Sequence, residues 1–114
     1  MSTDQEKIDR FWDNYLLRLE KKGVKPEHRQ WFVKRAEGFL KAIQPRRLAE
    51  LDARDVADYL SRAGRDARLK AWQFRQVVDA IYNLGETAQA PWVAAVDWRH
   101  LERARRVSRV LAAV

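Results

Sequence analysis

Apolar residues recur every three or four positions along most of this 114-residue chain, and this spacing constrains its fold more than any other feature. An α-helix turns once every 3.6 residues, so apolar residues at that spacing line one face of a helix. No stretch alternates apolar and polar residues as a half-buried strand does, and only four Gly and three Pro interrupt the chain. The sequence therefore predicts an all-α fold of four to five helices. The expected apolar faces are Ile8, Phe11, Trp12, Tyr15, Leu16 and Leu19; Phe32, Ala36, Phe39, Leu40 and Ile43; Val56, Tyr59, Leu60 and Ala63; and Phe74, Val77, Val78 and Ile81.

The first two helices have recognisable ends. Gly23 follows two lysines, as a glycine that ends a helix in the left-handed conformation often does. Pro26 suits the first turn of the second helix, because the N–H that proline lacks is not needed there. We expect this helix to end before Pro45, since proline cannot continue it.

The third and fourth helices have polar starts and glycine ends. Asp52 is suited to cap the third helix, with Asp55 three residues later, and Gly64 is expected to end it. Asp66 is the expected cap of the fourth helix, and Gly85 its expected end. We expect residues 1–90 to form one helical domain, because this length supports a single core, and residues 91–114 to form a basic linker or tail.

The residue inventory excludes several kinds of site. The chain has no Cys, which rules out disulfides, thiol nucleophiles and cysteine zinc sites. His28 and His100 have no second ligand at metal-binding spacing, so we expect neither a metal nor a cofactor. Tyr15, Tyr59 and Tyr82 lie on or beside apolar faces, which favours core packing over a nucleophilic role. No apolar run approaches a membrane span or a signal peptide, so we expect a soluble, cytoplasmic protein with no membrane partner.

The basic residues are unevenly distributed. The chain has 23 Lys and Arg against 16 Asp and Glu, a net charge of +7. Residues 21–47 have nine basic and two acidic side chains, residues 65–85 have four and two, and residues 1–20 and 48–64 are net acidic. If the second and fourth helices lie side by side, they form a cationic face of the kind that binds nucleic-acid phosphates.

The expected outward side of the fourth helix is polar. Arg pairs with guanine and Gln with adenine in the major groove, so an Arg and Gln row at a helix start is suited to reading DNA. A solvated polar face explains the row equally well. Trp72 has two interpretations, since it could pack under the C-terminal segment or lie along a sugar-phosphate wall. The residues expected on this side are Arg68, Trp72, Arg75, Gln76, Asp79 and Asn83.

Three local patterns follow one another between residues 11 and 98. The first is WFVK at 31–34, followed by GFL at 38–40. The second is LDARDVADYL at 51–60, similar to a helix start of the form L-T-x-x-D-V-x-x-Y-L. The third is QVVDAIY at 76–82, followed by PW at 91–92 and VDW at 96–98. In this order they resemble the N-terminal SAM-like, core-binding domain of the tyrosine recombinases, the phage and integron integrase family.

The resemblance implies a SAM-like orthogonal bundle that forms half of a clamp around a recombination site. The second and fourth helices would then lie in or near the major groove of double-stranded DNA, and a full-length protein would also contact other recombinase protomers. The isolated domain is expected to be a monomer. The DNA-binding residues implied are Lys25, His28, Arg29 and Lys34 from the second helix, and Arg68, Lys70, Gln73, Arg75 and Gln76 from the fourth.

Catalysis is not expected from this chain. Recombinase chemistry requires a Tyr nucleophile, together with Arg and a His or Lys that stabilise the transition state, and the resemblance implies that all of these lie in a separate C-terminal domain. His100 and Arg103 match the family's His-x-x-Arg spacing, but no Tyr follows them, so we assign them no catalytic role. The prediction is a non-catalytic DNA-binding module for DNA integration and recombination.

Two other functions stay open at this point. The chain could be a helical protein–protein interaction module, because exposed tryptophans also suit oligomer contacts. It could also be a helix-turn-helix regulator, which would require a stable dimer on a palindromic site. No dimerisation helix is evident for the regulator.

Overall fold

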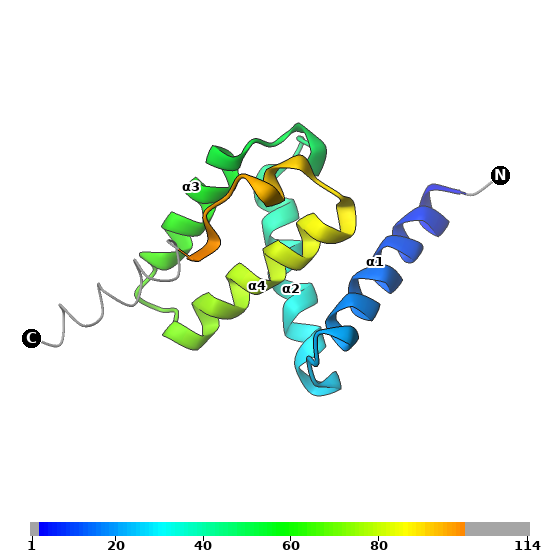
Figure 1. Cartoon of the computed structure of the whole chain (residues 1–114), viewed down its shortest axis with the longest axis horizontal. Coiled ribbons are helices and arrows are strands. Elements are labelled where there is room, and N and C mark those ends of the chain that lie inside the picture. Colours follow the sequence, from blue (N-terminus) through cyan, green and yellow to red (C-terminus); the bar gives the residue numbers. More distant parts are fainter. Residues whose placement is uncertain (1–2, 100–114) are drawn as a thin grey trace, which may run out of the picture.

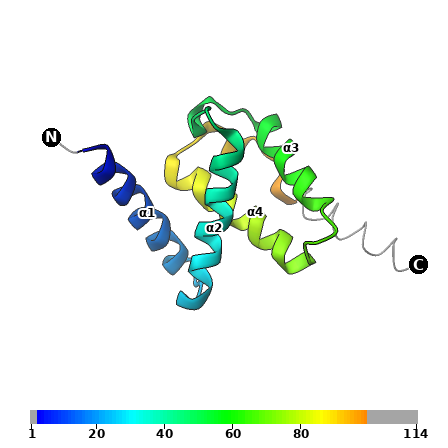
Figure 2. The same ribbon diagram turned by 180° about the vertical axis from the view of Figure 1, so that it is seen from behind.

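Among the described helices, α4, Ala71–Ala88, has the most buried residues, and the other helices are arranged around it. The computed structural model describes residues 3–99, in which α1 (Asp4–Lys21), α2 (Pro26–Ile43) and α3 (Ala53–Gly64) all pack on α4. Figures 1 and 2 show α2 crossing α4, with α1 and α3 on either side of that crossing. No strand occurs among residues 3–99, so the prediction of a small all-α bundle is confirmed.

The helix ends of the first half follow the local signals in the sequence. Gly23 has a φ of 85°, in the left-handed region where glycine carries no steric penalty, directly after the end of α1. Pro26 is the first residue of α2 as predicted, and α2 ends at Ile43, before Pro45. Ala36, Phe39 and Ile43 of the predicted apolar face are buried in the core.

The start of α3 is held by a reciprocal pair of hydrogen bonds. The Asp52 carboxylate accepts a bond from the Asp55 N–H (2.8 Å), and the Asp55 carboxylate accepts one from the Asp52 N–H (3.0 Å). The backbone bond from Asp52 and the Arg46 guanidinium, 3.1 Å away, lower the pKa of the Asp55 carboxyl. The predicted cap and the predicted end at Gly64 are both confirmed.

Both predicted ends of α4 were wrong. Lys70 is the residue that precedes the helix, whereas Asp66 accepts hydrogen bonds from the backbone and side chain of Arg68 in the turn before it. Gly85 lies inside α4, and the helix ends only where Gln89 adopts a left-handed φ of 54°. Gly85 serves close packing, because a Cβ there would lie 2.5 Å from the Trp92 ring.

The core continues past residue 90, the predicted end of the helical domain. A short 3-10 helix, Pro91–Ala94, brings Trp92 onto α4, and the indole is 2% exposed. Its N–H donates to the Leu48 carbonyl oxygen over 2.9 Å. Val96 is also buried. The packed fold therefore includes these residues, whereas most of the predicted basic tail, with His100 and Arg103, lies outside the described residues.

The apolar face of α1 is only half covered. Tyr15 and Leu19 are buried as predicted, but Ile8 is 50% exposed and Leu16 is 36% exposed. The prediction that the whole face is buried was wrong. Figure 1 shows the reason: the N-terminal part of α1 extends beyond the rest of the bundle, so no described helix covers it.

Candidate nucleic-acid interface

The first halves of α2 and α4 diverge from their crossing and leave an open groove of about 440 Å³. α2 and α4 are joined through Phe39, Ala36 and the apolar side of α4, which places their polar flanks next to each other. The condition set by the charge pattern, that the second and fourth helices lie side by side, is therefore met. We call this the α2–α4 groove; it is lined by His28, Trp31, Arg35, Trp72, Gln73 and Gln76.

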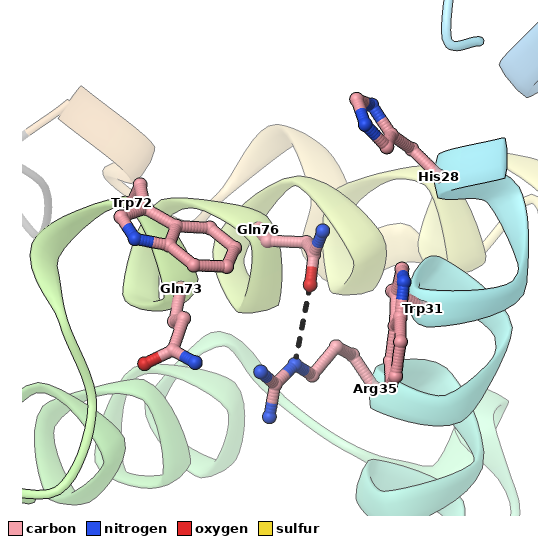
Figure 3. Close-up of a pocket in the computed structure, with 6 residues that line it drawn as sticks. All are labelled: His28, Trp31, Arg35, Trp72, Gln73 and Gln76. Carbon is pink, nitrogen blue, oxygen red and sulfur yellow. Dashed lines mark hydrogen bonds between the residues drawn. The ribbon is translucent and has the colours of Figure 1, made fainter.

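Two indoles form the walls of the α2–α4 groove. Trp31 on α2 is 44% exposed and Trp72 on α4 is 59% exposed, although both are large apolar side chains. Figure 3 shows them on opposite sides, with the amides of Gln73 and Gln76 and the Arg35 guanidinium between them. Trp72 is thus a wall of the groove, in contact with solvent. Aromatic walls with polar groups between them suit a ligand that has both flat surfaces and hydrogen-bonding edges.

The polar groups in the α2–α4 groove are loosely tied to one another. The Arg35 Nε donates to the Gln76 Oε1 over 3.4 Å, a long hydrogen bond (Figure 3). The Gln73 side chain is turned back, and its Oε1 accepts a bond from the Lys70 N–H over 2.8 Å at the start of α4. Because this hydrogen bond is weak, Arg35 and Gln76 can each replace it with a hydrogen bond to a ligand at little cost in free energy.

The predicted α2 residues fall at different places. Lys25 precedes the helix and is exposed, and His28 lines the α2–α4 groove. Arg29 is half-buried, and its Nε donates to the Val24 carbonyl oxygen (3.0 Å), so it holds the turn between α1 and α2. Lys34 is exposed, with its Nζ 4.6 Å from the centre of the Trp31 ring. Only His28 of these four therefore faces the groove, with Lys34 beside it.

The predicted residues of α4 are more closely grouped. Gln73 and Gln76 line the α2–α4 groove, and Arg75 is exposed on the same half of the helix. Lys70 precedes the helix and is exposed. Arg68 lies in the turn before α4, where the Asp66 carboxylate holds it at 3.1 Å and raises its pKa.

Asn83 was wrongly placed on the outward side of α4. It is fully buried, its Nδ2 donates to the Tyr15 carbonyl oxygen (3.2 Å), and its Oδ1 accepts from the Lys22 ammonium (2.9 Å). In the second half of α4, Asn83 lies among buried neighbours at Ile81, Leu84 and Gly85, so this polar residue joins α1 to α4 and does not face solvent. The outward polar row ends before this half.

Trp31 and Arg35 are groove residues that the predicted site did not include. They lie four positions apart on α2, which places them on the same flank of the helix. One signal for Trp31 was present in the sequence, since it falls outside the apolar face formed by Phe32, Ala36 and Phe39. Arg35 had no comparable signal, because its role follows from the approach of α4.

Two tyrosines in the described part of the chain have shifted pKa values. Burial raises the pKa of Tyr15 and Tyr59, so both phenols stay protonated at neutral pH. The Tyr15 hydroxyl donates to the Ala80 carbonyl oxygen (3.0 Å), a structural contact between α1 and α4. Among residues 3–99, no three His, Asp or Glu side chains gather as metal ligands, and no helix has the length and apolar character to cross a membrane.

The geometry therefore describes an open groove between two crossed helices, lined by two indoles, two amides, an imidazole and one guanidinium. Comparisons of the chain with protein-family models, with curated proteins and with solved structures gave no match in any of the three searches.

Proposed function

We propose that this chain is a non-catalytic module that binds double-stranded DNA through the first halves of α2 and α4, as the resemblance to tyrosine-recombinase core-binding domains implies. The main support for the proposal is that the two basic segments, residues 21–47 and 65–85, lie next to each other where α2 packs on α4. The charge pattern suggested a cationic face only if the two helices were neighbours. The resemblance adds the reaction context, DNA integration and recombination, and places any chemistry outside the described residues.

The chemistry of the α2–α4 groove supports nucleic acid as the ligand. Lys34, with its Nζ 4.6 Å from the centre of the Trp31 ring, and Arg75, on the same half of α4 as Gln76, are exposed cations, and neither forms an ion pair with another described residue. Gln76 supplies an amide that can pair with a base edge in the major groove. Trp72 supplies an apolar surface that can lie along deoxyribose. Phosphates would neutralise the cations, and the polar groups would keep hydrogen-bond partners.

The test is a titration of a fluorescently labelled duplex, followed by anisotropy. With about four phosphate contacts, the logarithm of the binding constant should fall with a slope of about −3.6 against the logarithm of salt, a loss of about 100-fold between about 50 and 200 mM. Substituting Lys34→Ala and Arg75→Ala should weaken binding and reduce the slope by about one each.

Arg54→Ala is the matched control for this titration. Arg54 is exposed on α3, makes no ion pair with a described residue and does not line the α2–α4 groove. Its removal changes the net charge by the same amount as the test variants. If the three variants bind alike, the effect is one of overall charge and the groove is not the contact surface. If the unsubstituted chain does not bind duplex even at low salt, the proposal is wrong.

The exposed part of α1 favours one other function, an interaction module. On its apolar side, Ile8 is 50% exposed and Leu16 is 36% exposed, on a helix that extends beyond the bundle. Exposed apolar side chains on one side of a helix are common where proteins associate. Sedimentation over a range of concentrations would test this function, since Ile8→Asp should abolish self-association that Lys34→Ala and Arg75→Ala leave intact.

A further inference from the structure

A second groove lies on the other side of α2, between α2 and α3, with a volume of about 450 Å³. We call it the α2–α3 groove. Three cationic side chains line it: Lys34 and Arg35 from α2, and Arg62 from α3. Arg35 lines the α2–α4 groove as well, so the two grooves meet at this residue.

The three cations outnumber the one acidic side chain in the lining of the groove. None of them forms an ion pair within residues 3–99. The one acidic side chain in the lining, Asp66, is held by Arg68 at 3.1 Å. Like charges in one concavity repel each other and lower the stability of the fold, unless an anion neutralises them. A cluster of this kind is therefore suited to an anionic ligand.

A neutral donor completes the α2–α3 groove. Tyr59 lines it from α3, with its ring packed edge-on against Phe39 at a centroid distance of 4.9 Å. The Tyr59 hydroxyl makes no hydrogen bond with any other residue of the described chain. Burial raises its pKa, with Arg35 opposing part of that rise, so the hydroxyl keeps its proton at neutral pH and can donate it. A half-buried phenol without a protein partner is available to donate to a ligand oxygen.

We propose that the α2–α3 groove binds one phosphate group of the DNA backbone, with Arg62, Arg35 and Lys34 as charged donors and Tyr59 as a neutral donor. The inference rests on the proposed function and extends it, because it places a backbone contact on α3 and adds Arg35, Tyr59 and Arg62 to the contact residues. Several N–H and O–H donors around one tetrahedral oxyanion are the arrangement that phosphate recognition requires.

The experiment repeats the duplex titration with two variants that separate charge from hydrogen bonding. Arg62→Ala should weaken binding about tenfold, as expected for a hydrogen bond to a charged group, and should reduce the salt slope by about 0.9. Tyr59→Phe should weaken binding about fivefold and leave the slope unchanged, because a neutral donor releases no counterion. Arg54→Ala, on the same helix but outside the groove, should match the unsubstituted chain.

The outcomes distinguish this inference from the proposed function. If duplex binds and Arg75→Ala weakens it, but Arg62→Ala and Tyr59→Phe match Arg54→Ala, the phosphate site is wrong and the DNA-binding function stands. If duplex does not bind at low salt, the proposed function fails.

A titration with inorganic phosphate at constant ionic strength, followed by NMR, tests whether the groove binds free phosphate and not a phosphate of the DNA backbone. Shifts of the Tyr59 resonances that require Arg62, without any effect of Arg62→Ala on duplex binding, would identify a site for free phosphate and overturn the assignment to DNA. Thermal melts of each variant, with transitions like that of the unsubstituted chain, exclude unfolding as the cause of any loss.

Discussion

α1 and α4 are both 18 residues long and both amphipathic, yet they occupy opposite positions in the molecule. Eight residues of α4 are buried, because α1, α2, α3 and the segment around Trp92 all pack on this helix. In α1 only Tyr15 and Leu19 are buried. The difference teaches that an apolar stripe predicts a helix and its orientation, whereas its position relative to the other helices decides how much of it is covered.

The largest expected effect comes from truncating one leucine in each of the two helices. Leu84→Ala in α4 removes a side chain that is fully buried and should lower the free energy of unfolding by about 2 to 5 kcal/mol. Leu17→Ala in α1 removes one that is 46% exposed and should change it by about 0.5 kcal/mol or less. Urea denaturation followed by circular dichroism measures both. Equal effects would contradict the unequal roles of the helices.

Glycine substitution should give opposite signs at two helical positions. Gly85→Ala in α4 places a Cβ 2.5 Å from the Trp92 and Val93 side chains, so overpacking should cost about 1 to 3 kcal/mol. Gly38→Ala in α2 meets nothing within 4 Å and should stabilise by about 0.5 to 1 kcal/mol, because alanine loses less backbone entropy. Thermal melts of the two variants decide the matter; stabilisation by both would mean that Trp92 is not packed on α4.

The Tyr15 hydroxyl is one polar tie from α1 to α4, through the Ala80 carbonyl oxygen. Tyr15→Phe should cost about 1 kcal/mol at neutral pH, the typical net value of one hydrogen bond. Burial raises the pKa of Tyr15 above the ordinary 10.0, so the folded state holds the proton that the unfolded state releases. Stability is therefore complete below pH 10.0 and falls as pH rises above it.

The pH dependence separates this tie from simple packing. Denaturation at pH values on both sides of 10.0 should show a smaller alkaline loss for Tyr15→Phe than for the unsubstituted chain. Tyr59→Phe is the control, because burial raises the pKa of that phenol too and it should remove a separate part of the loss. An alkaline loss that Tyr15→Phe leaves unchanged would contradict a buried hydroxyl.

The smallest expected effect is that of the ion pair between the same two helices. Lys22 at the end of α1 lies 2.5 Å from the Glu86 carboxylate of α4, and both side chains are partly exposed. Glu86→Gln should cost about 0.5 kcal/mol at low salt and nothing measurable at about 1 M salt, where exposed charges are screened. Glu20→Gln, on the exposed surface of α1, is the control. A cost that persists at high salt would indicate a contact other than charge.

Local signals predicted the ends of α1, α2 and α3, but not those of α4. The Asp52 and Asp55 pair, Gly23 and Pro26 act over three or four residues, so their roles can be predicted from the sequence. Gly85 and Asn83 were mispredicted, because each is governed by residues distant in the chain. The Asn83 amide bonds to Tyr15, 68 positions away, and Gly85 accommodates Trp92 from a segment beyond the helix.

Some residues of the candidate site could also be predicted from the sequence, and others could not. Lys34, Arg75 and Gln76 could be selected from charge pattern, helical phase and the resemblance. Lys34 and Gln76 each line one of the two grooves, and Arg75 is exposed on the same half of α4 as Gln76. Arg35 could not be selected from the sequence, because basic residues are common on helix surfaces. Arg35 lines a groove only because another helix lies next to it. Arg62 and Tyr59 meet α2 from α3, which no local pattern specifies.

The sequence by itself determined the helices, their inward faces and the concentration of positive charge in two segments, since these depend on helical period, capping and composition. Only the tertiary structure decided that α4 is central, that part of α1 stays exposed, and that Arg35 lies where two grooves meet. The physical reason is that helix crossings are set by packing between side chains far apart in sequence, and a groove exists only where two such helices diverge.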